Sequence, residues 1–577
     1  MIEDRPHLRG DIAVSFVACA LVGLIAACGG IAFNYFVIFA NRMWLPDPMP
    51  LGFADLDEAT ALICLSLPIL GGVIVGQLTR LLPDRRPHGP ADAILAAHSV
   101  PAMLDQRSGL ISATMAATSL SFGASVGQYG PIVHLGAVLG SMSARLLRLP
   151  ARLGEVMLGA GAAAAVSAVF IAPIGGLLFA HEVVLRHYAL RTFAPVAVAS
   201  VIGYVTTLLV FPHGMALPAP GGGLMHPASL LVLVVLGVAA GGVAVVYMRA
   251  IEIAGAIAKR VAVPASLKPV IAGLIVGVAA IKLPQLLGLG LATTNAALDG
   301  QLGGGMALLL VAAKILAVAL CLGFGYYGGV FSPALFIGAA FGTAWAALLG
   351  PGLAPVLPEA LSASALAIAG MAAVVSTVVG APISTVIIVL ELTGNYEMAI
   401  GTTVTIVFAH LVTHRFVGRS LFDRQLMARG LDLSTGRERI ALARQPIAPW
   451  IEGDCVRVAP DAAAESVIRR LIDGEASAAF VVDRGGRYLG QLSLVNLLRA
   501  ERRGDGTAKA GELLRPSEIR LTASTSLLEA IQLLGRFTGE SAPVVGVDGE
   551  TFLGVVREAA VLQAYQTISQ AVRRLEA

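Results

Sequence analysis

The segment GASVGQYGPIVHLG, residues 123–136, places four glycines and a proline inside a long apolar region. The same arrangement returns near Pro333: glycine, alanine and glycine follow both Pro131 and Pro333 after five, six and nine residues. A second pair of segments repeats with nearly the same offset, APIGGLLFAHE at 172–182 and APISTVIIVLE at 381–391. Two matches in the same order predict a membrane protein built from two related halves, as in many secondary transporters.

The composition predicts a membrane body followed by a soluble tail. Of the 577 residues, 56% are hydrophobic and 13% are charged, whereas soluble domains carry about 25% charged residues. Residues 431–577 hold 37 charged side chains, and the much longer segment 1–430 holds only 40. The net charge is +3 and Lys and Arg form no run, which argues against a nucleic acid partner. The five cysteines lack C-x-x-C spacing, so we expect no metal site.

We expect a membrane domain over residues 1–430, with repeat halves at about 11–211 and 228–417. Several apolar runs exceed the roughly 20 residues of a spanning helix and carry Gly-Pro interruptions, which predict short helices meeting inside the membrane. The first run extends to about residue 40 and favours a membrane helix over a cleaved signal. Arginines near the ends of several runs are plausible cytoplasmic markers. We expect a multi-pass protein of the cell or inner membrane with both termini in the cytoplasm.

The Gly-Pro segments predict unwound loops that lead into helices beginning at Pro131 and Pro333, with a third start at Pro90. Proline favours the first turn of a helix, where its missing N–H is not needed. Because a helix start carries free N–H groups and about half a positive charge, facing starts form an anion site without a buried lysine. Alternatively, the glycines only allow close helix packing, but three such starts in a repeat favour the anion site.

At these residues the sequence resembles the CLC family of chloride channels and chloride/proton antiporters. The family signature G-x-S-x-G-x-E-G-P corresponds to GASVGQYGP at 123–131, and G-x-F-x-P corresponds to GVFSP at 329–333. A third signature, G-S-G-I-P, is degraded to PHGPA, which puts His88 where the family often has a serine. The resemblance implies an all-α CLC fold with two inverted-topology repeats and many short, tilted and broken helices. It also implies a homodimer in which each subunit has its own pore.

The resemblance further implies two anion sites. The central site would use the N–H groups of Val330 and Phe331, the outer site would use those around 127–130, and His88 would lie on the intracellular side. The family's pore tyrosine corresponds to Phe422, which removes one hydroxyl donor and should weaken central binding by about 1 kcal/mol. The expected anion-binding and pore residues are His88, Gly89, Gly127, Gln128, Tyr129, Gly130, Gly329, Val330, Phe331 and Phe422.

Two replacements in the resemblance bear on the mechanism. Antiporters of the family have glutamates where this chain has Tyr129 and Val183. Tyrosine has an ordinary pKa of about 10 and valine does not titrate, so neither carries protons near neutral pH. We therefore expect passive chloride conduction or uncoupled chloride transport, with Tyr129 as a gate that acts as a plug or as a hydrogen-bond donor. Two alternatives stay open: proton coupling through Glu182 or His88, and a closed membrane sensor regulated by the soluble tail.

Other polar residues of the membrane part have simpler interpretations. Glu182 and Glu391 occupy equivalent repeat positions, which favours a helix-capping role. His134 and His181 are interpreted as core histidines, whereas a protonated His88 would make conduction depend on pH. We expect no enzyme activity, since the G-x-S-x-G pattern at 123–127 lies in a helical run with no strand before it.

After a polar linker at 431–442, residues 443–577 contain a repeated helix–strand–turn–strand–helix pattern, at about 443–503 and 510–577. This soluble α/β tail resembles a pair of CBS domains, which usually pack together and can bind adenine nucleotides. The first copy offers Ser493 and Asn496 at the family's nucleotide positions, but the ribose-binding carboxylate is missing from both copies. We therefore favour a structural or dimerising role over nucleotide sensing. Chloride is the bound ion that we expect, and an adenine nucleotide at the tail is the less favoured alternative.

Overall fold

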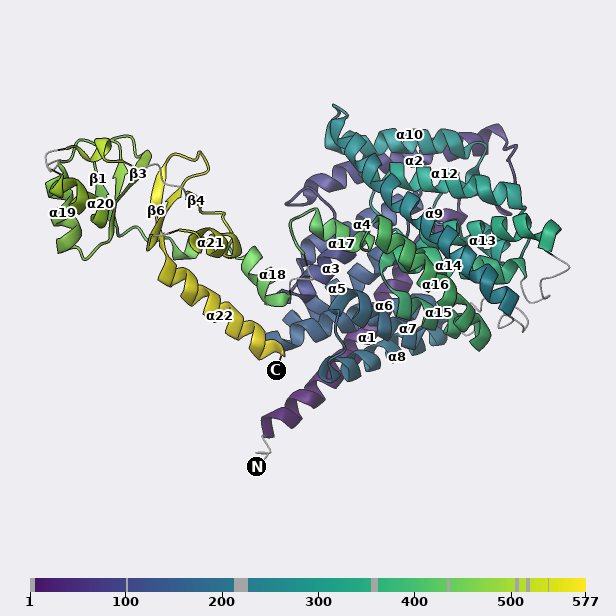
Figure 1. Ribbon diagram of the computed structural model, residues 1–577. Helices are drawn as coiled ribbons and strands as arrows, with labels where there is room; N and C mark the ends of the chain where they lie inside the picture. The colour runs from purple at the N-terminus through teal and green to yellow at the C-terminus, as the bar shows by residue number, and fades with distance from the viewer. Residues whose placement is uncertain are drawn as a thin grey trace. The chain divides into compact units, whose positions relative to one another are not determined.

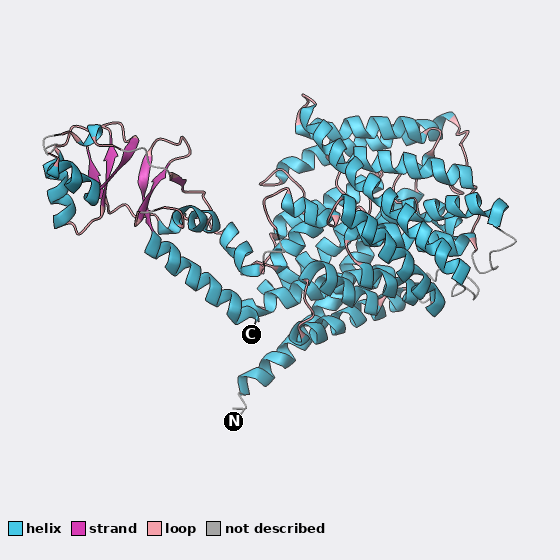
Figure 2. Cartoon of the chain, in the orientation of Figure 1, coloured by secondary structure: helices cyan, strands magenta, loops and turns pink. Residues whose placement is uncertain are grey.

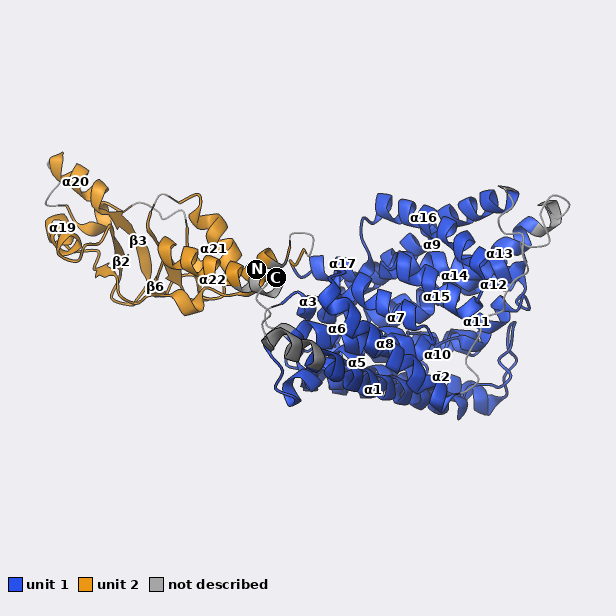
Figure 3. Ribbon diagram, turned by 90° about the horizontal axis from the view of Figure 1, so that it is seen from below, with its two compact units in different colours: residues 1–429 blue, residues 430–577 orange. Residues whose placement is uncertain are grey.

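The computed structural model describes residues 6–99, 102–211, 227–353, 362–432, 436–503, 508–514, 519–537 and 539–576. The chain divides into two compact units, Met1–Arg429 and Gly430–Ala577 (Figure 3). The first unit is helical and the second carries the described strands (Figure 2).

The membrane unit is built from packed helices (Figure 1). In the described residues each half contains eight α-helices. The helices of the first half are α1 (Pro6–Arg42), α2 (Glu58–Leu78), α3 (Pro90–Ala97), α4 (Gln106–Ser121), α5 (Tyr129–Leu146), α6 (Gly154–Phe170), α7 (Pro173–Phe179) and α8 (Leu190–Val210). Those of the second half are α9 (Pro227–Arg260), α10 (Lys268–Ala280), α11 (Leu291–Leu298), α12 (Gly304–Gly323), α13 (Phe331–Leu353), α14 (Ala363–Val379), α15 (Pro382–Thr393) and α16 (Tyr396–Phe416). The short helix α17 (Leu421–Met427) follows them.

Helix length agrees with the broken membrane helices expected from the sequence. Seven helices of the described chain are long and apolar enough to cross a membrane. Others, including α6, α14 and α15, are apolar but have only 10–17 residues, fewer than the roughly 20 that a span requires. The first unit is thus an integral, multi-pass membrane domain that mixes full spans with shorter helices.

Two helix starts differ from the sequence-based expectation. Helix α3 begins at Pro90 as expected, but α5 begins at Tyr129 and α13 at Phe331, each two residues before the expected proline. A proline is tolerated there because the N–H groups of the whole first turn have no acceptor inside the helix. The two aromatic residues therefore stand at the helix starts themselves, beside the free N–H groups.

The first motif loop, residues 123–128, leads into α5, and the second, residues 328–330, leads into α13. Their glycines are explained by direct contact between the repeat halves. The N–H of Gly127 donates to the carbonyl of Gly329 at 2.7 Å, and the N–H of Gly329 donates back at 2.5 Å. A Cβ atom on Gly127 would lie 2.7 Å from that carbonyl oxygen, and one on Gly329 would lie 2.8 Å from the nitrogen of Gly130. Any side chain would force the two loops apart.

Two carboxylates reinforce the pairing of the halves by capping each other's helices. The carboxylate of Glu391, on α15, accepts hydrogen bonds from the N–H groups of Ile174 and Gly175 at the start of α7, at 2.9 and 2.8 Å. The carboxylate of Glu182 accepts two N–H groups at the start of α15, also at 2.9 and 2.8 Å. Anions stabilise helix N-termini, so both glutamates have the capping role favoured by their repeat positions.

Glu182→Gln and Glu391→Gln are each expected to lower the free energy of unfolding by about 1–2 kcal/mol, because a charged acceptor at a helix start is replaced by a weaker neutral one. Thermal unfolding in detergent measures this loss, with Glu58→Gln on the exposed start of α2 as the matched control. If Glu182→Gln instead left stability unchanged but altered proton movement, the capping role would be wrong.

The second unit contains two similar modules. The first is built from β1 (Val456–Val458), α19 (Ala464–Asp473), β2 (Ala478–Val482), β3 (Tyr488–Ser493) and α20 (Leu494–Arg502). The second is built from β4 (Leu521–Thr522), α21 (Leu527–Leu534), β5 (Ser541–Val545), β6 (Phe552–Arg557) and α22 (Glu558–Glu576). In each sheet the first strand pairs parallel to the second, and the second pairs antiparallel to the third.

The modules pack together and recruit part of the expected linker. A hydrophobic cluster that includes Phe480, Tyr488 and Phe552 joins the two sheets, as expected for a CBS pair. The helix α18 (Arg437–Arg444) lies largely within 431–442, where we expected a polar linker, and its Leu442 is buried in the core of the second module. Because charged residues surround Leu442, the segment was interpreted from sequence as a polar linker.

Candidate anion site

The two paired loops bring the starts of α5 and α13 together. The N–H groups of Tyr129 and Gly130 in α5, and of Val330 and Phe331 around the start of α13, make no hydrogen bond with any described residue. Four unpaired donors, each near the positive end of a helix dipole, constitute an anion-binding arrangement. The bridge between Gly127 and Gly329 holds these donors close to one another.

Other amides expected to bind an anion are engaged inside the protein. The N–H groups of Gly127 and Gly329 bind each other's carbonyls, and the N–H of Gln128 donates to the hydroxyl of Ser332 at 3.2 Å. These three positions therefore shape the loops and have no free backbone donor. Of the backbone N–H groups expected at the outer site, only those of Tyr129 and Gly130 have no partner among the described residues.

The PHGPA segment around His88, called the inner motif below, also differs from the expectation. The N–H of His88 donates to the hydroxyl of Ser112 at 2.8 Å, and the N–H of Gly89 donates to the carboxylate of Asp92 at 2.9 Å. The imidazole Nε2 of His88 lies 3.1 Å from a carboxylate oxygen of Asp84. The start of α3 thus already holds a carboxylate of its own, and the backbone N–H groups of His88 and Gly89, both expected pore residues, are engaged inside the protein.

Asp92 is the centre of an ion-pair network at this inner motif. Its carboxylate receives Arg86 at 2.9 Å and Arg429 at 2.7 Å. Burial alone would raise the pKa of Asp92, but the hydrogen bond from Arg86 and the charge of Arg429 lower it to about 2. The group is therefore a fixed negative charge near neutral pH and cannot carry protons.

The side chain of Tyr129 is held among aromatic rings. It stacks on Phe170 with ring centroids 4.2 Å apart and meets the edge of Phe331 at 5.3 Å. Phe331 also contacts the ring of Phe179 at 6.4 Å. Only 7% of Tyr129 is exposed, so its ring closes the space beside the two helix starts.

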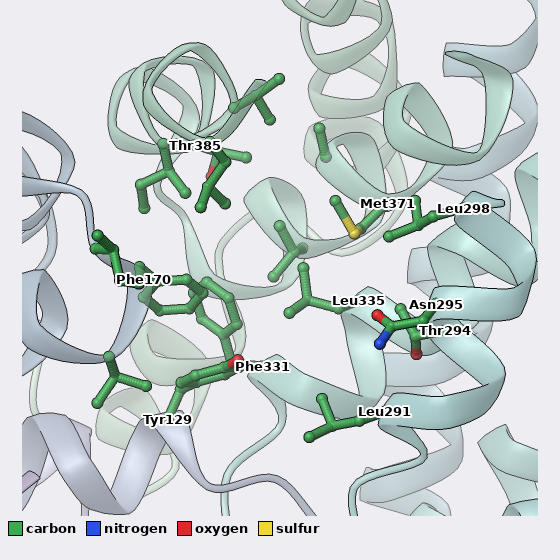
Figure 4. A pocket seen from close by; sticks show the side chains of 17 residues that line it. Tyr129, Phe170, Leu291, Thr294, Asn295, Leu298, Phe331, Leu335, Met371 and Thr385 are labelled. Carbon is green, nitrogen blue, oxygen red and sulfur yellow. The ribbon is translucent and has the colours of Figure 1, made fainter. Parts of the chain in front are cut away.

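A cavity of about 130 Å³ adjoins this aromatic cluster. Figure 4 shows Tyr129, Phe170 and Phe331 on one side, with Thr294 and Asn295 of α11 on the other. The remaining walls are mostly aliphatic side chains from α13, α14 and α15. Within this cavity wall, Tyr129, Thr294, Asn295 and Thr385 are the side chains with polar donors.

Val183 and Phe422, the other two positions that the resemblance singled out, are both buried in the membrane unit. Val183 is buried in the π-helical segment Ala180–Leu185, next to the capping residue Glu182. Phe422 is buried on α17, which packs against α3 and α14. The described ring partners of Tyr129 are Phe170 and Phe331 rather than Phe422.

The residues expected to contact a nucleotide in the tail have a structural role. The hydroxyl of Ser493 accepts the N–H of Asn496 at 3.3 Å and caps α20. Where the second module would supply the equivalent residues, it has Arg557 and Ala560. These groups do not fit the ribose of a nucleotide, because no carboxylate stands at either position.

Several site residues were missed in the sequence. Tyr327 donates its hydroxyl to the carbonyl of His88, Tyr247 donates to the carbonyl of Val330 at 3.2 Å, and Phe170 stacks on Tyr129. Tyr327 lies just before the GGVFSP motif and could have been noticed from that position. Tyr247 and Phe170 lie far from either motif and leave no comparable signal.

Comparison with known proteins gives consistent results over the membrane unit. The sequence model of a family described as voltage gated chloride channel matches residues 71–414. A ClcB-like chloride channel protein of Ralstonia nicotianae is 29% identical over 415 residues, covering 70% of this chain and 96% of the relative. The chloride channel protein CLC-f of Arabidopsis thaliana is 31% identical over 364 residues, covering 58% of this chain and 45% of the relative.

Solved structures show the same fold. A slow cyanobacterial Cl⁻/H⁺ antiporter, 20% identical, covers 72% of this chain and 97% of its own with a TM-score of 0.62. A eukaryotic CLC transporter, 17% identical, covers 95% of this chain and 97% of its own with a TM-score of 0.59. At these identities the likeness establishes the arrangement of helices, which agrees with the expected fold class.

Proposed function

The chain belongs to the voltage-gated chloride channel family, and we propose that within it the protein is a passive pathway for chloride or a similar small anion. One observation carries the proposal: the starts of α5 and α13 meet, and their N–H groups make no hydrogen bond with a described residue. Such amides bind a dehydrated anion by hydrogen bonds and helix-dipole charge. A single-file passage past Tyr129 would then connect the cavity with the inner motif.

The proposal differs from coupled antiport because the resemblance places the antiporters' two glutamates at Tyr129 and Val183, which carry no protons near neutral pH. The alternative carrier Glu182 has both carboxylate oxygens bound at the start of α15, and Asp92 is fixed by two arginines. Hydrogen bonds of this kind favour the charged form of a carboxylate. They therefore oppose the protonation that a proton carrier must undergo during transport.

A second function is favoured by the packing of Tyr129. Its ring packs against both Phe170 and Phe331, which also contact each other, and a ring held in such a cluster is the arrangement expected of a closed gate. A protein that stays closed would act as a membrane sensor, with the tail as its soluble module. The two functions share one geometry and differ in whether the ring moves.

Reconstituted liposomes test these functions directly. Chloride-loaded vesicles are diluted into low chloride, valinomycin is added to release the potassium counter-charge, and external chloride and pH electrodes record both ions. We expect chloride efflux that begins with valinomycin and no accompanying proton movement. Uphill, stoichiometric proton movement would establish antiport, and absence of chloride efflux in all conditions would establish the closed sensor.

The assembly and orientation follow from the same proposal. The protein functions as a homodimer with one pathway in each subunit and with both termini in the cytoplasm. Exposed apolar residues on α8, α15 and α16, among them Leu209, Ile383 and Leu411, provide a surface for lipid or for a second subunit. The tail serves as a structural, dimerising module, since its Ser493 is engaged as a helix cap.

A further inference from the structure

A buried lysine lies in the membrane unit, although the helix starts alone were expected to supply the anion site. Lys314, on α12, is fully buried. Its ammonium donates to the carbonyls of Leu286 and Gly288, both at 3.0 Å, and lies 5.1 Å from the ring centroid of Phe336. Among the described residues, no carboxylate comes within ion-pair distance of it.

Lys314 holds a loop that is connected to both the first motif loop and the cavity wall. Gly288, whose carbonyl it binds, donates its own N–H to the carbonyl of Gly123 at 3.1 Å, at the beginning of the first motif loop. Beyond Gly288 the chain continues into α11, which carries Thr294 and Asn295 in the cavity wall. Through the Gly288 segment, the lysine therefore links the first motif loop to the cavity wall.

The contact with Phe336 places the ammonium against α13, the helix that begins at the second motif loop. Phe336 follows Phe331 by five residues on α13, a rise of roughly 7.5 Å at 1.5 Å per residue. The ammonium therefore packs on the same helix whose first residues carry unpaired amides. Charges interact more strongly inside a protein than in water, because the effective dielectric constant is about 20 rather than 80.

The chemistry of an unpaired buried ammonium points to an anion as its counter-charge. Carbonyl oxygens replace part of its hydration but leave the positive charge uncancelled, and an isolated buried charge is costly. An anion bound at the amides of Val330 and Phe331 would offset that cost, and the lysine would attract it in return. A neutral side chain of the same shape would offer no such attraction.

We propose that Lys314 is a positioning residue that raises the anion affinity of this pathway by its charge and that ties the first motif loop to α11. This inference rests on the proposed function and adds a long-range cationic contribution to the backbone site. It separates two properties of the lysine. Its hydrogen bonds support the fold, whereas its charge acts on the anion.

The test compares Lys314→Met, Lys314→Gln and Lys314→Arg in the full-length protein. Two readouts are used: the rise in melting temperature as chloride replaces gluconate, and the chloride concentration that gives half-maximal efflux. We expect about tenfold weaker chloride affinity in the Met and Gln variants, and less than about a threefold change in the Arg variant, which keeps the charge. Lys268→Met is the matched control, since Lys268 donates to a helix-end carbonyl but lies in a half-buried position at the start of α10.

Each outcome has one meaning. A lower melting temperature without chloride, together with an unchanged chloride-induced rise, would reduce Lys314 to a structural residue and overturn the inference. If the Met variant does not fold, the Gln variant, which keeps a donor for one carbonyl, decides the question by the same comparison. If wild-type protein shows neither chloride efflux nor a chloride-induced rise, the proposed function fails instead.

Discussion

Replacing Tyr129 by alanine is expected to raise the chloride flux of the reconstituted protein by roughly tenfold or more. The ring is held by its contacts with Phe170 and Phe331, and such pairs are worth about 0.5–1.5 kcal/mol each. Because about 1.4 kcal/mol changes an equilibrium tenfold, removal of both contacts shifts the pathway strongly toward the open state. Valinomycin-initiated chloride efflux measures the change.

Two further variants distinguish the roles of the tyrosine. Tyr129→Phe keeps the ring, so a plug predicts wild-type flux, whereas a hydroxyl that donates to the anion predicts a reduced flux. The exposed Tyr396 offers a matched control, and Tyr396→Ala should leave efflux unchanged. A Tyr129→Ala protein that folds and binds chloride but conducts no faster than wild type would show that the ring is not the gate.

The repeated features of this molecule could be predicted from sequence because they depend on backbone geometry. A loop that touches another loop needs glycine, and a helix start tolerates proline, so the contact between Gly127 and Gly329 left a visible pattern. The cross-capping of Glu182 and Glu391 was visible for the same reason, since equivalent positions in two halves carry the same residue. Features that depend on local backbone geometry and occur in both halves can therefore be recognised in the sequence.

The partners of individual amides could not be predicted. Ser332 and Asp92 bind the N–H groups of Gln128 and Gly89, two residues expected at the pore, and a hydroxyl or carboxylate in a sequence does not reveal its hydrogen-bond donor. Lys314 was missed for a different reason. A single lysine in an apolar run ordinarily predicts an interrupted or lipid-avoiding helix, and only the fold shows that two loop carbonyls and an aromatic ring surround it.

Alanine at Gly127 or Gly329 is expected to cause the largest loss of folded protein. The new Cβ on Gly127 would lie 2.7 Å from the Gly329 carbonyl oxygen and 2.8 Å from Cδ of Pro333. Both neighbours belong to backbone or ring and cannot turn aside, so the loops must separate. Overpacking of this kind costs roughly 1–3 kcal/mol, to which the loss of the two bridging hydrogen bonds adds about 0.5–1.5 kcal/mol each.

Size-exclusion chromatography and thermal unfolding in detergent measure this loss, and chloride efflux measures its consequence for the anion site. Gly242, on α9, has no atom within 4 Å of the position a Cβ would take, so Gly242→Ala should be neutral or stabilise the helix by up to about 1 kcal/mol. The contrast isolates the contact between the halves from the general effect of adding a methyl group. Should Gly127→Ala match Gly242→Ala in melting temperature and efflux, the two loops would have to be free to separate, and the amides of α5 and α13 could not hold an anion between them in a fixed geometry.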